Sequence, residues 1–295
     1  MKKIMVNVIE IQDKKYPELL KKIKDAPKKL YYKGEFDEDI FKNCLAVVGS
    51  RRLTSYGRRM TELLVSEIAV KGITIVSGFM YGGDEAAHRT AVEAGGRTIA
   101  VMPCGINVIH PEYQEDLYNK ILNNNGLIIS EFEGDLLPAL WTYPKRNRIV
   151  AGLSKAVLVV EAGLNSGTLI TTGFAKTFGR KIFAVPGPLT SEVSKGTAQL
   201  IKQGAEIVMD VSDILKYFNI STIDSIKANS SKKNSNLIQL SALEKEIIEH
   251  LKTESLEADI LARMLSIPIS KISASLSLMQ IKGFIGQEGD KYYIN

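Results

Sequence analysis

Short apolar runs alternate with helical stretches along the middle of this 295-residue chain, and this alternation constrains the fold more than any other feature. The runs lack polar alternation, which is typical of strands covered on both faces, and they lie at 45–49, 74–77, 97–101, 127–130, 156–160 and 181–185. Helical periodicity between them predicts helices at 56–71, 84–94, 116–123 and 169–178. Repeated strand–helix units predict an α/β fold with a doubly wound, mostly parallel sheet, and such sheets bind ligands beyond the carboxyl ends of their strands.

The pattern changes after Phe218. Residues 221–236 are rich in Ser, Asn and Lys without apolar periodicity, so we interpret them as a linker. Three helical segments and a terminal hairpin pattern follow in the order of a winged helix, with helices expected at 243–251, 256–265 and 270–281. Ser241 and Glu244 have the spacing of a capping box before the first of them. We therefore expect four parts: a basic N-terminal extension packing on the core at 1–40, the α/β domain at 41–220, the linker at 221–236, and a small winged-helix domain at 237–295.

Composition sets limits on the function. The formal net charge of +5 and the pI of about 8.9 are compatible with nucleic-acid binding without requiring it. Cys44 and Cys104 lack metal-ligand spacing and lie beside apolar runs, so we expect buried free thiols in a reducing compartment. No apolar run approaches the ~18 residues of a membrane span, and the N-terminus lacks the apolar stretch of a secretion signal. We therefore expect a cytoplasmic protein.

Residues 145–172 combine two features that bind anions. Lys145, Arg146 and Arg148 form a basic cluster, and a glycine-rich loop ending at 166–168 opens the next predicted helix. Backbone N–H groups at such a helix start bind phosphate. Two such features in succession predict a ligand with more than one phosphate, either a nucleotide or a nucleic-acid backbone.

Four glycine-bearing loops follow predicted strands, at 49–52, 77–84, 161–168 and 186–188. One such loop alone is typical of a turn, but four at one edge of one sheet predict a ligand site. The later glycines of a GxGxxG fingerprint are absent after Gly49, and no Walker A pattern occurs, so neither dinucleotide binding nor P-loop chemistry is supported.

Three side chains have both a functional and a structural interpretation. Asp84 and His88 lie four residues apart on a predicted helix, either as a metal-binding or acid–base pair or as a helix N-cap and a hydrogen-bonded histidine, which we favour. Glu161 is interpreted as a general base, as a ligand of a ribose hydroxyl, or as an anchor for loop amides, and the sequence leaves these alternatives open.

The basic cluster at 145–148 is similarly ambiguous. Its arginines either contact phosphates or brace the fold by pairing with Glu131 or Glu161, and we expect one of them to brace the fold while the others face the ligand. Trp141, the only tryptophan, and Tyr143 lie close by and either stack on unpaired bases or are buried. We expect no catalytic residue, no metal site and no cofactor.

Together these motifs resemble the DprA/Smf family, the DNA-processing proteins of bacterial natural transformation. The resemblance covers about residues 11–218 in the family's order, and its most specific matches are AVVGSR at 46–51, YPKRNRIVAGLS at 143–154 and VVEAGLNSGTLIT at 159–171. It implies an extended Rossmann fold that binds single-stranded DNA with little sequence preference. It also implies homodimerisation and the loading of RecA recombinase onto incoming DNA.

The motifs and the resemblance together indicate two groups of site residues. DNA contacts are expected at Gly49, Ser50, Arg51, Arg52, Tyr143, Lys145, Arg146, Asn147 and Arg148. Phosphate or nucleotide contacts are expected at Ser77, Gly78, Gly163, Ser166, Gly167 and Thr168. Tyr81 stands where the family commonly has a basic residue, which weakens the expected basic groove.

The C-terminal block resembles the winged helix of some family members. Its third helix carries only Lys271 and Lys282 as cations, so we expect protein docking or an accessory role rather than sequence-specific duplex binding.

The expected function is a non-catalytic protein that binds and protects single-stranded DNA and loads RecA, with single-stranded DNA, RecA and a second copy as partners and no membrane. The alternative is a nucleotide-binding enzyme or sensor of the wider Rossmann-like group, similar to phosphoribohydrolases, with Glu161 as base. The PGGxGTxxE signature of those hydrolases is missing here. A third class is a transcription regulator that acts through the winged helix.

Overall fold

The computed structural model of this protein describes residues 5–220 and 241–294, so the linker expected at 221–236 lies outside the described residues. The chain divides into two compact units, residues 1–222 and 223–295. Each unit has its own hydrophobic core and is described separately.

A nine-stranded sheet forms the centre of the first unit, in the order β1-β2-β6-β5-β4-β3-β7-β8-β9. The strands from β6 to β9 are parallel, while β2 pairs antiparallel with β6 and β1 antiparallel with β2. Their bounds are β1 (Asn7–Glu10), β2 (Lys29–Gly34), β3 (Cys44–Val48), β4 (Thr74–Ser77), β5 (Thr98–Val101), β6 (Leu127–Ser130), β7 (Ala156–Val159), β8 (Lys181–Ala184) and β9 (Glu206–Ile207). The doubly wound, mostly parallel sheet is therefore confirmed.

The six predicted strands agree with the observed ones to within one residue at each end, whereas β1, β2 and β9 were not predicted. The residues of β1 and β2 lie in the lysine-rich segment that was interpreted as an extension packing on the core. Instead they enlarge the sheet itself, because β2 pairs with β6 over four residue pairs. β1 and β9 are the edge strands and β2 lies next to the edge. Strands at or near an edge carry charged residues, so they lack the continuous apolar run of a central strand.

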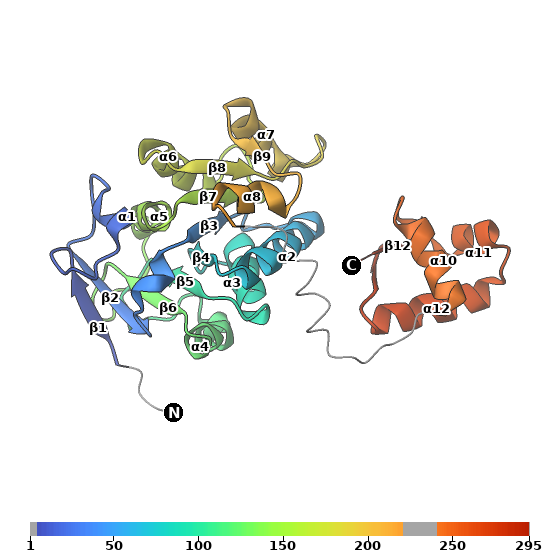
Figure 1. Ribbon diagram of the computed structural model, residues 1–295, viewed down its shortest axis with the longest axis horizontal. Coiled ribbons are helices and arrows are strands. Elements are labelled where there is room, and N and C mark those ends of the chain that lie inside the picture. The colour runs from blue at the N-terminus through green and yellow to red at the C-terminus, as the bar shows by residue number, and fades with distance from the viewer. Residues whose placement is uncertain (1–4, 221–240, 295) are drawn as a thin grey trace. The chain divides into compact units, whose positions relative to one another are not determined.

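Helices cover both faces of the sheet (Figure 1). On one face α1, α5, α6 and α7 pack over one core cluster, and on the other α2, α3, α4 and α8 cover two more. Their bounds are α1 (Glu18–Lys21), α2 (Ser55–Val70), α3 (Gly83–Glu93), α4 (Glu115–Asn123), α5 (Thr142–Leu153), α6 (Thr168–Thr177), α7 (Lys195–Lys202) and α8 (Val211–Tyr217). Helices α5 and α6 thereby pack against the central strands.

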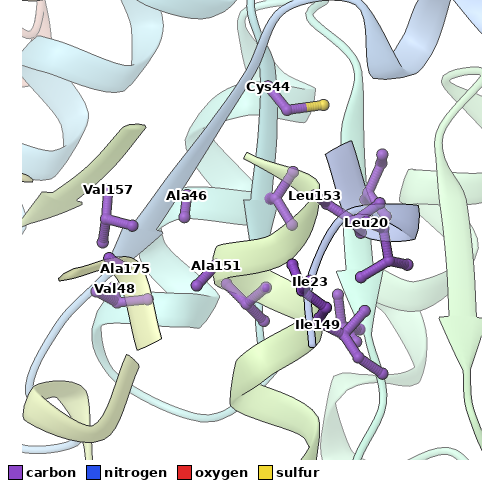
Figure 2. Close-up of a cluster of buried hydrophobic side chains, with 14 of the residues drawn as sticks. Leu20, Ile23, Cys44, Ala46, Val48, Ile149, Ala151, Leu153, Val157 and Ala175 are labelled. Carbon is purple, nitrogen blue, oxygen red and sulfur yellow. The ribbon is translucent and has the colours of Figure 1, made fainter. Parts of the chain in front are cut away.

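Helix α5 packs closely on α1 and on β3 and β7 (Figure 2). A Cβ on Gly152 would lie 2.8 Å from Cδ1 of Leu20, so any larger residue here would require the Leu20 side chain to shift. Ile149 is 1 % exposed, and burying such a side chain stabilises the fold by about 1.5–3 kcal/mol. The same cluster contains Cys44, whose thiol pKa burial raises to about 12. Cys44 and Cys104 are both buried and unpaired, as expected.

The second unit is the predicted winged helix. Its elements are α10 (Ala242–Leu251), β10 (Leu256–Glu257), α11 (Ala258–Leu265), α12 (Ile269–Ile281), β11 (Ile285–Glu288) and β12 (Lys291–Ile294), with the strands in the order β10-β12-β11. The capping box of Ser241 and Glu244 is present. The helix expected at 256–265 begins two residues late, because Leu256 and Glu257 pair with β12.

Among the described residues no single helix is long and apolar enough to span a membrane. By length and composition alone, α11 and α12 together would pass, as a pair bent by 120°. Both helices contribute buried side chains to the core of the winged-helix unit.

Candidate nucleic-acid interface

The direction of strand order reverses between β3 and β7. From β3 the chain proceeds through β4 and β5 to β6 on one side, and it then returns to β7, which pairs with β3 on the other side. The loops that leave the carboxyl ends of β3 and β7 therefore lie next to each other. In doubly wound sheets this is the position at which ligands bind.

Three glycine loops are fastened together at this edge. The amide of Gly83 donates to the carbonyl of Ser50 at 3.0 Å, and a Cβ on Gly83 would lie 2.6 Å from Cα of Gly49. From the other side, the Thr168 hydroxyl donates to the Gly49 carbonyl at 3.0 Å. The loops after β3, β4 and β7 consequently form one connected surface, which brings together three of the four predicted glycine loops.

Glu161 anchors the loop after β3. Its carboxylate accepts hydrogen bonds from the Thr54 amide at 2.9 Å and from the Thr54 hydroxyl at 2.5 Å, and the residue is only 2 % exposed. Thr54 in turn caps α2 through its hydroxyl, which accepts from the Gly57 amide. Of the three interpretations of Glu161, the anchoring one describes the observed contacts.

Arg51 lies between two tyrosine rings. Its guanidinium carbon is 5.6 Å from the ring centre of Tyr81 and 5.2 Å from that of Tyr143. The side chains of Arg51 and Arg52 are exposed, and within residues 5–220 neither forms an ion pair with a carboxylate. These two arginines therefore offer uncompensated positive charge at the edge of the sheet.

Tyr143 is held in place by a second ring. Its hydroxyl shares a hydrogen bond of 3.0 Å with Nε2 of His110, and the two rings lie roughly edge to face. Burial, and next the positive charge of Arg51, lower the pKa of His110, so the imidazole is neutral near pH 7. Neither His110 nor Tyr81 was among the predicted site residues, because their partners Tyr143 and Arg51 come from distant segments.

Arg146 is buried rather than facing a ligand, with 3 % exposure. Its guanidinium donates to the carbonyls of Gly78 and Val101, and its Nε donates to Oδ1 of Asn147 at 3.2 Å. A Cβ on Gly78 would collide with this guanidinium, so the glycine leaves room for the arginine. Burial lowers the pKa of Arg146 to about 10, which still leaves it charged.

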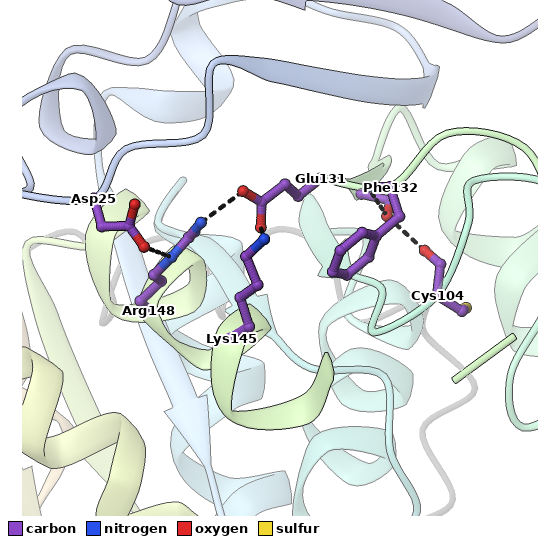
Figure 3. Close-up of polar contacts among 7 residues, drawn as sticks. Asp25, Cys104, Glu131, Phe132, Lys145 and Arg148 are labelled. Carbon is purple, nitrogen blue, oxygen red and sulfur yellow. Dashed lines mark hydrogen bonds and ion pairs between the residues drawn. The ribbon is translucent and has the colours of Figure 1, made fainter. Parts of the chain in front are cut away.

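Arg148 braces the fold as well (Figure 3). Its Nε donates to Asp25 at 3.0 Å and one terminal nitrogen to Glu131 at 2.6 Å, while its side chain is 4 % exposed. Lys145 completes the chain of charges, with Nζ 3.6 Å from the second oxygen of Glu131. The sequence suggested the pairing with Glu131 but not with Asp25. The expectation that only one arginine braces the fold was wrong, because both guanidinium groups are enclosed by partners from other elements.

The remaining predicted residues differ in accessibility. Ser77 is fully buried and donates to the Val47 carbonyl at 2.6 Å, so it supports the loop instead of opening to a ligand. Asn147 lies across from the loop after β7, with Nδ2 3.5 Å from the Gly167 carbonyl. Ser166 accepts from the Thr168 amide at 3.2 Å, just before α6, whose N-cap is Gly167. Gly167 is exposed, Gly163 is partly exposed, and Gly78 is buried under Arg146.

Asp84 and His88 have structural contacts. Nδ1 of the buried His88 lies 2.7 Å from the Thr98 hydroxyl, and burial together with the charge of Arg146 lowers its pKa to about 3. Asp84 lies in the first turn of α3, whose N-cap is Gly82, and burial raises its pKa. The histidine is therefore hydrogen-bonded as favoured, while the aspartate is not the N-cap. In the part of the chain that the structure describes, no three His, Cys, Asp or Glu side chains converge on a possible metal position.

Comparison with known proteins identifies the first unit. Residues 7–219 match the family model described as DNA recombination-mediator protein A. The chain belongs to this family, DprA/Smf. Residues 231–291 match the DprA winged helix domain, so both units are typical of the family.

Several DprA/Smf proteins are similar over most of this chain. Protein Smf of Escherichia coli is 37% identical over 273 residues, which cover 92% of this chain and 72% of that protein. DprA of Streptococcus pneumoniae is 40% identical over 208 residues, covering 70% and 73%. The X-ray structure of the S. pneumoniae protein superposes with a TM-score of 0.67 at 38% identity, covering 73% of this chain and 74% of that one.

A second DprA structure, from Helicobacter pylori, superposes with a TM-score of 0.65 at 30% identity and covers 73% of this chain and 96% of that one. It is described as showing the single-stranded DNA binding mode of that protein. A role in DNA processing is therefore supported for this DprA-family chain.

Proposed function

We propose that this DprA-family protein binds single-stranded DNA with little sequence preference along the carboxyl edge of its sheet, and that it does so without catalysing a reaction. The observation that carries the proposal is Arg51, an exposed guanidinium held between the rings of Tyr81 and Tyr143. A guanidinium binds phosphate through a planar set of donors, and aromatic rings stack on any base. Neither contact depends on sequence.

The polar side chains that would read base edges or transfer protons are engaged within the protein. Asn147 accepts from Arg146, and Glu161 is bound by the amide and hydroxyl of Thr54. Amide side chains are the usual readers of adenine, and a free carboxylate is the usual general base. Their engagement supports a sequence-tolerant and non-catalytic role.

Binding to labelled oligonucleotides tests this proposal. Fluorescence anisotropy should show tighter binding of single-stranded than of duplex DNA, and similar affinities for oligonucleotides of different sequence. The logarithm of the affinity should fall by about 0.7 per phosphate contact for each tenfold increase in salt concentration. Equal or tighter duplex binding would contradict the proposal. Thermal stabilisation by a mononucleotide but not by oligo-dT would favour the nucleotide-binding alternative.

We further propose that the protein acts as a homodimer and loads RecA onto single-stranded DNA. The resemblance to DprA/Smf proteins implies both, and the description of the family as a recombination mediator is compatible with the loading role. Sedimentation velocity of the full chain should give the mass of a dimer. RecA ATP hydrolysis on DNA already covered by a single-strand-binding protein should start sooner when this protein is added, and an unchanged lag would contradict the loading role.

The winged helix is proposed to serve a role other than duplex reading. Lys282, the C-cap of α12, pairs with Glu244 at 2.8 Å, and Lys271 lies near the start of the helix. The exposed face instead carries Leu278 and Ile281, which are 53% and 84% exposed. Replacing Lys271 with alanine should leave duplex affinity unchanged, and a tenfold loss would restore duplex reading as the function of this unit.

A further inference from the structure

An exposed apolar ledge lies beside the proposed DNA site. It consists of Leu136, Leu137, Leu140 and Trp141, which are 41%, 71%, 92% and 55% exposed. The ledge follows β6 and ends at the N-cap of α5, one residue before the helix that carries Tyr143 and Lys145. Large apolar side chains gathered in this way on a surface mark a binding site.

The ledge is held rigidly on both sides of Trp141. Before it, the amides of Gly105 and Ile106 donate to the carbonyls of Leu136 and Phe132, at 2.8 and 3.1 Å. After it, the buried Thr142 hydroxyl donates to the Ala139 carbonyl at 2.8 Å. A backbone segment held in this way loses little conformational freedom when a ligand binds.

The indole is also oriented by a neighbouring ring. Trp141 meets Phe132 with 5.5 Å between ring centres and an interplanar angle of 89°. The Nζ atom of Lys145 lies 5.3 Å from the centre of that same Phe132 ring (Figure 3). Trp141 and Lys145 therefore both lie against the Phe132 ring. An aromatic ring can stack on the base of a single-stranded nucleotide, and a nearby cation can contact its phosphate.

The ledge and the Arg51 site flank the start of α5. Trp141 is the N-cap of α5 and Tyr143 lies in its first turn, so their Cα atoms lie within about 7.6 Å of each other. Side chains two residues apart on a helix point to different sides, and accordingly Trp141 meets Phe132 while Tyr143 meets His110. A single strand that reaches both rings therefore passes around the start of α5. Arg51 lies near one ring, and Lys145, whose Nζ is also 3.6 Å from Glu131, lies near the other.

We propose that Trp141 is a second base-stacking platform, which extends the path of the single strand from Tyr143 to the end of β6. The inference rests on the proposed function, because it assumes that the strand lies across this edge. The ligand is a nucleobase of single-stranded DNA.

The chain itself supplies the readout, because Trp141 is its only tryptophan. Titration of the full-length protein with oligo-dT of about 16 nucleotides should quench the intrinsic fluorescence in parallel with binding measured by anisotropy. An oligonucleotide of equal length with abasic sites keeps the phosphates but lacks the bases. It should produce far less quenching at the same occupancy.

Variants supply the second measurement. Replacing Trp141 with alanine should weaken oligo-dT binding roughly five- to 150-fold, whereas phenylalanine should retain affinity to within roughly threefold. Leu137→Ala, on the same ledge and 71% exposed, is the matched control and should change affinity less than roughly twofold. Unchanged thermal stability of the variants shows that folding is not the cause.

The outcomes separate this inference from the proposed function. Binding by anisotropy without a change in fluorescence overturns the stacking platform and leaves the proposed function intact. Equal quenching by the abasic oligonucleotide also overturns it, as does equal loss of affinity for Trp141→Ala and Leu137→Ala, which indicates a general apolar contact. The absence of any single-strand binding overturns both.

Discussion

Arg51 and Tyr143 meet at 5.2 Å between guanidinium carbon and ring centre, although one lies in the loop after β3 and the other in the first turn of α5. Tyr81 approaches the same guanidinium from the loop after β4. The cation is therefore positioned by two aromatic rings, while no carboxylate of the described residues neutralises it. An arginine held in this way keeps its charge available to an anion.

Replacing Arg51 with alanine should weaken single-strand binding by about 1–2 kcal/mol, or roughly five- to thirtyfold, because one charge-assisted phosphate contact is lost. The slope of log affinity against log salt should become shallower by about 0.7. Lys42→Ala is the matched control, since this exposed lysine precedes β3 and so lies at the opposite edge of the sheet. Equal effects of the two variants would show that only the net charge matters.

Gly57 and Gly173 lie in helices but should respond oppositely to alanine. A Cβ on Gly57 would lie 2.5 Å from the Glu161 carboxylate, so Gly57→Ala displaces the anchor of the Arg51 loop and should destabilise the protein by about 1–3 kcal/mol. Gly173 has no atom within 4 Å of such a Cβ and is exposed, so Gly173→Ala should stabilise by about 0.5–1 kcal/mol. Urea unfolding measures both, and destabilisation of equal size would contradict the steric argument.

Removing Arg148 should be far more destabilising than removing its exposed partner. Arg148→Met leaves Glu131, which is only 17% exposed, without its main partner, and should lower the free energy of unfolding by about 3–5 kcal/mol. Asp25→Asn should cost less than about 1 kcal/mol, because the side chain of Asp25 is 79% exposed. The folded Arg148→Met protein should bind DNA with an affinity close to that of the parent. A selective loss of affinity without loss of stability would restore Arg148 as a DNA contact.

His88 should make the protein sensitive to acid. Its pKa is about 3 in the folded state and ~6.5 when unfolded, so the unfolded chain binds one more proton between these values. Stability from this group is complete above pH ~6.5 and decreases by about 1.4 kcal/mol for each pH unit below it. Between pH 6.5 and 5, the free energy of unfolding of His88→Gln should therefore decrease by about 2 kcal/mol less than that of the parent. Urea unfolding at both pH values measures this difference.

Asp84 opposes this trend, because burial raises its pKa in the folded protein and the folded state then binds the extra proton. The comparison of parent and His88→Gln keeps Asp84 in both proteins, so their difference reports the histidine. Identical pH profiles would contradict the assignment of His88 as a buried neutral group.

The sequence by itself determined the elements that local patterns encode. The six central strands and the four helices predicted between them agree with the structure to within one residue, and so does the capping box at Ser241. Apolar periodicity and capping residues act over a few neighbours, so they can be read along the chain. The meeting of the glycine loops followed from the same patterns, because parallel strands place their carboxyl ends at one edge.

Only the tertiary structure decided which charges are free. Arg146 bonds to Gly78, 68 residues away, and Arg148 to Asp25, 123 residues away, so a cluster that looked like one basic surface is mostly internal. Arg51 and Arg52 carry the same charge as Arg146 and Arg148, but their side chains are exposed to solvent. A charged side chain is buried or exposed according to the partners that distant segments bring to it, since burying a charge without a partner is prohibitively costly. No local pattern records those partners.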